Sequence, residues 1–167
     1  GMMILTDGDK IEAIIPQKPE TDLEGYEIVD LASKYIMPGL VNLHLHLLSS
    51  GKPKKKESDP VKLVKLITSN GLLRKLGIKI CESAARTQLL SGVTTIRTSG
   101  GVENFDSVIR DKIDKGETIG PRILASNMAV SVEGGHMAHS LAYVAGSPEE
   151  AAEYVRIIAK DKPDWIK

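Results

Sequence analysis

The fold is decided by the stretch Tyr35-Ile36-Met37-Pro38-Gly39-Leu40-Val41-Asn42-Leu43-His44-Leu45-His46. A Pro-Gly turn opens it, and the apolar residues that follow predict a buried strand. Side chains two residues apart point to the same face of a strand, so His44 and His46 would share a face at its carboxyl end. Two imidazoles placed in this way can bind one metal ion. The spacing alone fits equally two histidines that only pack at a strand end.

Strands and helices alternate after Pro38. Further strands are predicted at residues 93–97, 122–126 and 164–167, where short apolar or β-branched runs follow glycine or proline. Helices are predicted from Asp59-Pro60 to about Gly92, with breaks near Gly71 and Gly77, then at residues 104–115, and after the capping box Ser147-Pro148-Glu149-Glu150. This order predicts an α/β fold with a parallel sheet or barrel.

Residues 2–36 are β-rich and form a separate predicted segment. Residues 3–6 and 10–15 flank Asp7-Gly8-Asp9, which is a hairpin turn signal. Residues 28–31 predict a third strand. Three strands with one apolar face need a partner layer, so this segment is expected to be part of a larger β domain.

Composition excludes several classes of protein. The 167 residues carry 22 basic and 22 acidic side chains and only 4% aromatics, which argues against a nucleic-acid or membrane partner. The lysine-rich segment 52–56 is interpreted as a solvated loop. Cys81 lies on an apolar helical face and is expected to be buried and inert. With no apolar run of membrane length and no signal-peptide pattern, the expected location is cytoplasmic.

Several segments together resemble the metal-dependent amidohydrolase superfamily, in its imidazolonepropionase-like and Xaa-Pro dipeptidase (prolidase)-like branch. The stretch from Met37 to His46 resembles the first-strand signature of that superfamily. The segments Gly92-Val93-Thr94-Thr95-Ile96-Arg97 and Gly120-Pro121-Arg122-Ile123-Leu124-Ala125-Ser126 resemble its second and third strands. Gly134-Gly135-His136 and Asp164-Trp165-Ile166-Lys167 are similar to an active-site loop and to the fourth strand.

The resemblance implies the front half of a (β/α)₈ barrel over residues 37–167, preceded by an incomplete β-sandwich segment over residues 2–36. It also implies a binuclear site for two divalent metal ions. His44 and His46 would bind one ion, and Lys167, carboxylated by carbon dioxide, would bridge both. Zinc is the default ion, although manganese, iron or cobalt suit the same ligands.

The implied activity is hydrolysis of a C–N bond in a dipeptide, an N-acyl amino acid or a cyclic amide through a metal-activated hydroxide. The catalytic aspartate expected on the eighth strand has no counterpart in this sequence, and the natural chain is expected to continue for about four more strands. His136, His139 and Arg97 are candidates for contacting the substrate. For each of the three, an ordinary loop or strand-end role is the alternative.

A different class of function stays open at this point. A chain without the base and the later ligands would be a catalytically incomplete fragment or scaffold that needs the missing half-barrel. The sequence does not identify the substrate or the metal, and it leaves open whether the protein forms a homo-oligomer.

Overall fold

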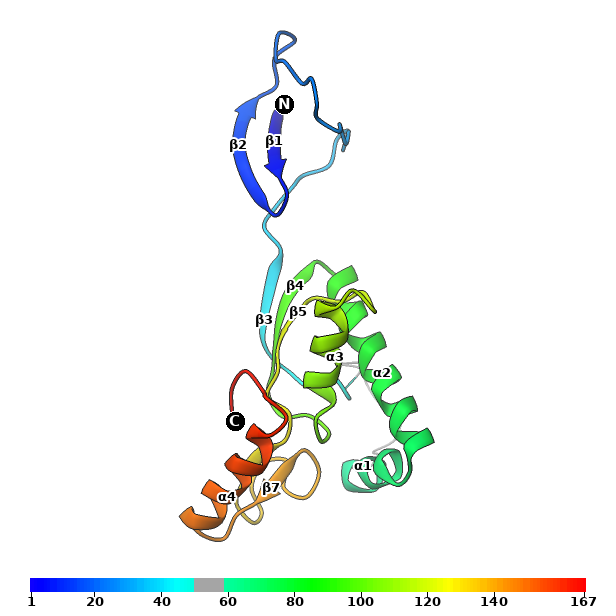
Figure 1. The fold of residues 1–167 in the computed structure, drawn as a ribbon, viewed down its shortest axis with the longest axis vertical. Coiled ribbons are helices and arrows are strands. Elements are labelled where there is room, and N and C mark those ends of the chain that lie inside the picture. Colours follow the sequence, from blue (N-terminus) through cyan, green and yellow to red (C-terminus); the bar gives the residue numbers. More distant parts are fainter. Residues whose placement is uncertain (50–58) are drawn as a thin grey trace. The chain divides into compact units, whose positions relative to one another are not determined.

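A computed structural model describes residues 1–49 and 59–167 of the chain (Figure 1). The chain divides into two compact units, Gly1–Met37 and Pro38–Lys167, and each is described by itself. The lysine-rich segment 52–56, predicted to be a solvated loop, lies outside the described residues. In the described part of the chain, no helix combines the length and the apolar character that crossing a membrane requires.

The first unit is built on an antiparallel hairpin. Strand β1 (Met2–Asp7) pairs with β2 (Lys10–Pro16), and Ile4 lies opposite Ile14. Gly8 in the connecting turn has a φ of 57°, a left-handed conformation that glycine adopts without steric cost. The predicted hairpin is confirmed.

The third strand predicted at residues 28–31 was wrong. These residues are not in a strand, and the Ile28 and Val29 side chains are 68% and 71% exposed. The Asp30 side chain accepts a hydrogen bond from the backbone N–H of Ala32 at 2.7 Å, so local turn bonding replaces strand pairing. Among the described residues of this unit the one sheet is the β1–β2 pair, and the β-sandwich stays a prediction.

The second unit alternates strands with helices, as the sequence predicted (Figure 1). Its elements in chain order are β3 (Leu40–Leu45), α1 (Pro60–Thr68), α2 (Gly71–Leu90), β4 (Val93–Thr98), α3 (Phe105–Asp114), β5 (Arg122–Leu124), β6 (Ala129–Ser131), β7 (Ala142–Val144) and α4 (Pro148–Ala159). Strands β3, β4 and β5 form a parallel sheet in that order, which confirms the α/β class.

The helix boundaries follow the predicted caps. Asp59 caps α1 by accepting hydrogen bonds from two backbone N–H groups, and Ser147 caps α4 by accepting one, from the N–H of Glu150. The break before Gly71 is confirmed, since Asn70 caps the start of α2. The break predicted near Gly77 was wrong, because α2 continues through it. A Cβ at Gly77 would lie 3.0 Å from the Phe105 ring, so glycine there permits close helix packing.

The fourth strand, predicted at residues 164–167, is absent. The Asp164 carboxylate accepts the backbone N–H of Ala125 at 2.8 Å, so a side chain occupies the donor that a strand ladder would use. Backbone bonds still hold the segment beside β5 and β6: the N–H of Asp164 donates to Ala125 O at 2.8 Å, and the N–H of Val130 donates to Lys167 O at 3.0 Å. The parallel pair β6–β7 was not predicted, because three-residue strands are too short to show alternation.

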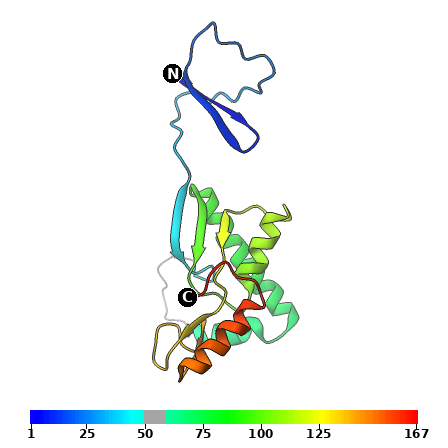
Figure 2. The ribbon, with the colours of Figure 1, turned by 60° about the vertical axis from the view of Figure 1, so that its left-hand side comes forward.

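Helices α2 and α3 pack against one face of the β3–β4–β5 sheet (Figure 2). Leu45, Ile96 and Ile123 belong to the core that the sheet forms with α2 and α3. Because side chains alternate along a strand, His44 and Arg97, each next to one of these core residues, lie on the opposite face. The candidate site is therefore on the sheet face away from the helices.

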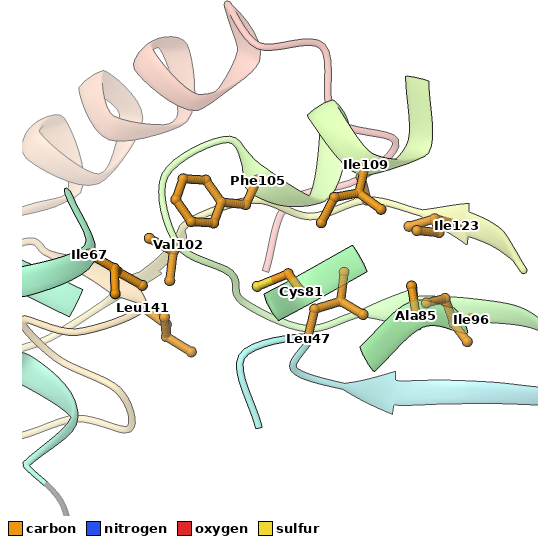
Figure 3. Close-up of a cluster of buried hydrophobic side chains, with 11 residues drawn as sticks. Leu47, Ile67, Cys81, Ala85, Ile96, Val102, Phe105, Ile109, Ile123 and Leu141 are labelled. Atoms are coloured by element: carbon orange, nitrogen blue, oxygen red, sulfur yellow. The ribbon is translucent and has the colours of Figure 1, made fainter. Parts of the chain in front are cut away.

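Buried apolar side chains from α1, α2, α3 and the strands converge in one cluster (Figure 3). Its members are Leu47, Ile67, Cys81, Ala85, Ile96, Val102, Phe105, Ile109, Ile123, Ala125 and Leu141. Cys81 is 2% exposed. Cys81 is thus buried, as predicted, and burial, together with the nearby Asp106 carboxyl, raises the pKa of its thiol to about 12.

Candidate metal centre

The structure brings the His44 and His46 rings together at the carboxyl end of β3. Their centroids are 5.4 Å apart and the ring planes are nearly perpendicular, at 78°. His44 is exposed and His46 is half-buried. The His44–His46 pair predicted from the sequence therefore lies at one end of the sheet, with both rings next to one another.

His46 is fixed by a backbone carbonyl on the neighbouring strand's turn. Its Nδ1 lies 2.8 Å from Gly100 O. A carbonyl oxygen only accepts, so Nδ1 carries the proton and the neutral ring presents an unprotonated Nε2. Partial burial lowers the pKa of His46, and the nearby Lys167 ammonium lowers it further, against the opposing effect of the Gly100 bond. Both effects favour the neutral ring, the form that ligates metals.

Lys167 meets the same turn one residue earlier. Its Nζ donates to Ser99 O at 2.9 Å, and its side chain is half-buried. Ser99 and Gly100 are consecutive, so two adjacent carbonyls of one turn hold the lysine and the histidine. The sequence did not predict this role for the turn, which we call the carbonyl turn (residues 99–101).

Hydrogen bonds to Ser126 and Asn127, which follow β5, fix the carbonyl turn. The N–H of Gly100 donates to Ser126 Oγ at 2.8 Å, and the N–H of Gly101 donates to Asn127 O at 2.6 Å. Gly100 has a φ of 109°, which a residue with a side chain rarely adopts. The N–H of Ser99 donates to Leu45 O at 2.9 Å, so all three backbone donors of the turn are paired inside the protein.

Asp106 lies beneath the carbonyl turn in the first turn of α3. It is 1% exposed, and a Cβ on Gly101 would lie 2.5 Å from its Oδ2. Burial raises the pKa of Asp106 to about 6, although hydrogen bonds from the Thr98 hydroxyl and the Asn127 backbone act in the opposite direction. Its Oδ2 has no hydrogen-bond partner among the described residues.

The two loop histidines differ in position. The His136 ring centroid is 6.5 Å from that of His46, so His136 borders the histidine pair. His139 points elsewhere and pairs with the exposed Glu133 carboxylate, with Nε2 3.1 Å from Oε2. Met137 and His139 have φ values of 64° and 63°, so the loop between them holds a left-handed backbone at two residues that are not glycine.

Arg97 lies in β4, beside the strand that carries the histidine pair. Its Nε donates to Leu43 O at 2.9 Å, and its guanidinium carbon is 4.5 Å from the centre of the Trp165 ring. This stacking on Trp165 gives Arg97 a structural contact in addition to the substrate role predicted for it.

His44, His46 and Lys167 can each be examined as ligands for a metal ion. The His44 and His46 imidazoles lie next to one another, and the lone pair of His46 is fixed at Nε2. Lys167 as an ammonium has no lone pair, so it fits only as a carboxylated lysine, which presents two anionic oxygens. Within residues 1–49 and 59–167, no group of three or more His, Cys, Asp or Glu side chains is arranged around one metal position. The two histidines fit a metal, and the lysine fits on carboxylation.

The chain belongs to the amidohydrolase family, whose profile matches residues 35–166. This confirms the family resemblance that the sequence motifs predicted. The chain is similar to a prolidase solved with N-methylphosphonate-L-proline, at 21% identity and a TM-score of 0.78 over 99% of this chain and 41% of that one. It is also similar to a provisionally named prolidase from Bifidobacterium longum, at 33% identity and a TM-score of 0.66, over 97% of this chain and 34% of that one.

One sequence relative has a different activity in its name. A dihydroorotase of Lactobacillus johnsonii is 43% identical over 54 residues, which are 32% of this chain and 12% of that enzyme. The chain thus spans well under half of the relatives it matches. The family match and the likeness to the B. longum protein support the prolidase-like branch that the motifs predicted.

Proposed function

We propose that this chain forms the N-terminal half of the barrel of a metal-dependent hydrolase that cleaves C–N bonds. The observation that carries the proposal is the convergence of His44, His46 and Lys167 at one end of a parallel sheet in a chain of the amidohydrolase family. Barrel enzymes carry their active sites at the carboxyl ends of the strands. The geometry supports that position for all three side chains.

His44 and His46 would hold one divalent ion, and Lys167, once carboxylated, would bridge it to a second. Bound divalent ions lower the pKa of water and polarise a carbonyl group. The chain's own contribution is to hold the His46 imidazole neutral and oriented through its bond to Gly100 O. Lys167 is half-buried, and its Nζ lies at the same turn as the His46 ring.

We propose a dipeptide or a small cyclic amide as the substrate class, with a Xaa-Pro dipeptide preferred. The support is the likeness to the B. longum protein at 33% identity; the 54-residue dihydroorotase match keeps the cyclic amide as the alternative. His136, which borders the histidine pair, would contact the substrate. His139 would contact the substrate from the loop between β6 and β7. Arg97 would contact it from β4, where the guanidinium could pair with a carboxylate of the substrate.

The test is a joint measurement of bound metal and of proline release from Xaa-Pro dipeptides by the full-length protein. His44→Ala should remove bound metal and activity together, because it deletes a ligand. His139→Ala is the matched control: it deletes an exposed histidine of the same domain and should leave the bound metal unchanged. A full-length protein that holds no divalent metal and loses no activity on His44→Ala would refute the proposal.

A further inference from the structure

One turn contacts both halves of the candidate centre. In the carbonyl turn, Ser99 O accepts from Lys167 Nζ at 2.9 Å, and the next carbonyl, Gly100 O, accepts from His46 Nδ1 at 2.8 Å. Lys167 and His46 are 121 positions apart in the chain numbering of this sequence, and no hydrogen bond joins their side chains directly. Their relative position therefore depends on the turn between them.

The carbonyl turn is itself fixed by the hydroxyl of Ser126, which hydrogen-bonds to neither Lys167 nor His46. Ser126 is fully buried, and its Oγ accepts the N–H of Gly100 at 2.8 Å. The Gly100 N–H lies in the same rigid peptide plane as Ser99 O, the acceptor for Lys167. The next plane carries Gly100 O and the Gly101 N–H, which Asn127 O accepts, so the Ser126 bond limits rotation about Gly100 and thereby the angle between the two acceptor carbonyls. The N–H of Ser126 itself donates to Thr98 Oγ1 at 2.9 Å, which ties the anchor back to β4.

We propose that Ser126 is a positioning residue, which fixes the carbonyl turn so that His46 is held in its Nδ1-protonated tautomer with Nε2 free for a ligand. Without a fixed acceptor at Nδ1, a neutral imidazole exchanges its proton between both nitrogens, and only the form with a free Nε2 can bind at that atom. Partners of this kind set the orientation and the basicity of a metal-binding histidine.

The same turn accommodates Lys167 in both of its proposed states. An ammonium donates to Ser99 O, and a carboxylated lysine keeps one N–H on Nζ, so the bond to Ser99 O can persist. The inference about metal binding rests on the function proposed above, whereas the tautomer of His46 can be measured in the protein without metal.

The test reads the tautomer of His46 by ¹⁵N-edited NMR of the metal-free protein at about pH 8, above the ordinary histidine pKa of about 6.5. The four histidines are assigned by single replacement. The wild-type His46 should show a protonated Nδ1 and an unprotonated Nε2. Ser126→Ala should shift both nitrogens toward values averaged over the two tautomers. The matched control is Ser107→Ala, which removes another buried hydroxyl. This hydroxyl accepts from Asn127 Nδ2 and makes no hydrogen bond with residues 99–101, so its loss should leave the tautomer unchanged.

The second measurement is the zinc affinity of the wild type and the variants, determined by titration with Zn²⁺. Ser126→Ala should weaken zinc binding about tenfold, in the range found for partners of metal-binding histidines, and Ser107→Ala should not. If Ser126→Ala does not fold, Ser126→Cys replaces it, because a thiol of similar size is a weaker acceptor and should give a smaller shift of the same sign.

Two results would overturn the inference: a wild-type His46 protonated at Nε2, or a folded Ser126 variant with an unchanged tautomer. Failure of the proposed function gives a different pattern. In that case zinc would not bind to the wild-type protein, while the tautomer would still respond to Ser126→Ala.

Discussion

Replacing Asp106 by asparagine tests the electrostatics beneath the carbonyl turn. The folded protein keeps this carboxyl fully buried, and its pKa is raised to about 6 from an ordinary value of 3.8. The folded state therefore binds the proton more tightly than the unfolded state. Stability falls as the pH rises through the interval between these two values, and the loss is complete above about pH 6. A shift of about two pKa units corresponds to about 3 kcal/mol.

Asparagine does not titrate, so the Asp106→Asn variant lacks this pH-dependent penalty. The free energy of unfolding of the variant minus that of the wild type should rise with pH, and most of about 3 kcal/mol should develop between about pH 4 and pH 7. The constant part of the difference reflects how well the amide fits and does not affect this slope. The hydroxyl and N–H that face the carboxylate can both donate to the amide oxygen, so the variant is expected to fold.

The assay is urea unfolding at a series of pH values, followed by fluorescence of Trp165, the single tryptophan of the chain. Ser107→Ala is the control, because it changes the adjacent buried residue without removing a titrating group. Its difference from the wild type should be independent of pH. A pH-independent difference for Asp106→Asn as well would refute the assignment of a buried, raised carboxyl pKa.

Two further replacements test the packing and the chain end by the same assay. Gly101→Ala should destabilise the protein by about 1–3 kcal/mol, because its Cβ would lie 2.5 Å from the buried Asp106 carboxylate. The control is Gly71→Ala at the start of α2, where the space around the Cβ is open, and it should be neutral or slightly stabilising. Equal stabilities of the two variants would contradict this packing. Asp164→Asn should cost about 1 kcal/mol at neutral pH, because Asp164 Oδ2 accepts from Ala125 N and Arg110 Nη1 at 2.8 and 2.9 Å. Partial burial opposes the effect, yet these donors hold the pKa of Asp164 below its ordinary value. The cost should therefore disappear as the pH falls below about 4, and a cost that persists in acid would contradict the assignment.

The parallel sheet could be predicted because its signals are local. The Pro-Gly turn before Leu40 and the β-branched run from Val93 mark strands by themselves, and Asp59, Asn70 and Ser147 sit where helix caps belong. The same local logic failed where side chains compete with the backbone. Asp30 and Asp164 bond to nearby N–H groups, and both of the strands predicted there are absent.

The candidate site also contains one part that the sequence predicted and one part that it could not predict. His44, His46 and Lys167 could be found from residue type, spacing and family resemblance. The carbonyl turn could not, because it acts through the backbone oxygens of Ser99 and Gly100, and every residue type carries a backbone oxygen. Only the three-dimensional structure indicates which side chains these carbonyls hold.

The most direct test of a metal centre at His44, His46 and Lys167 is the anomalous X-ray difference density of crystals of the full-length protein, measured at the absorption edge of the bound metal. The account predicts two peaks, one beside the His44 and His46 rings, with density for a carboxyl group on Lys167 Nζ lying between them. A protein crystallised with ample divalent metal and bicarbonate that shows neither a peak at the two histidines nor added density on Lys167 would contradict it.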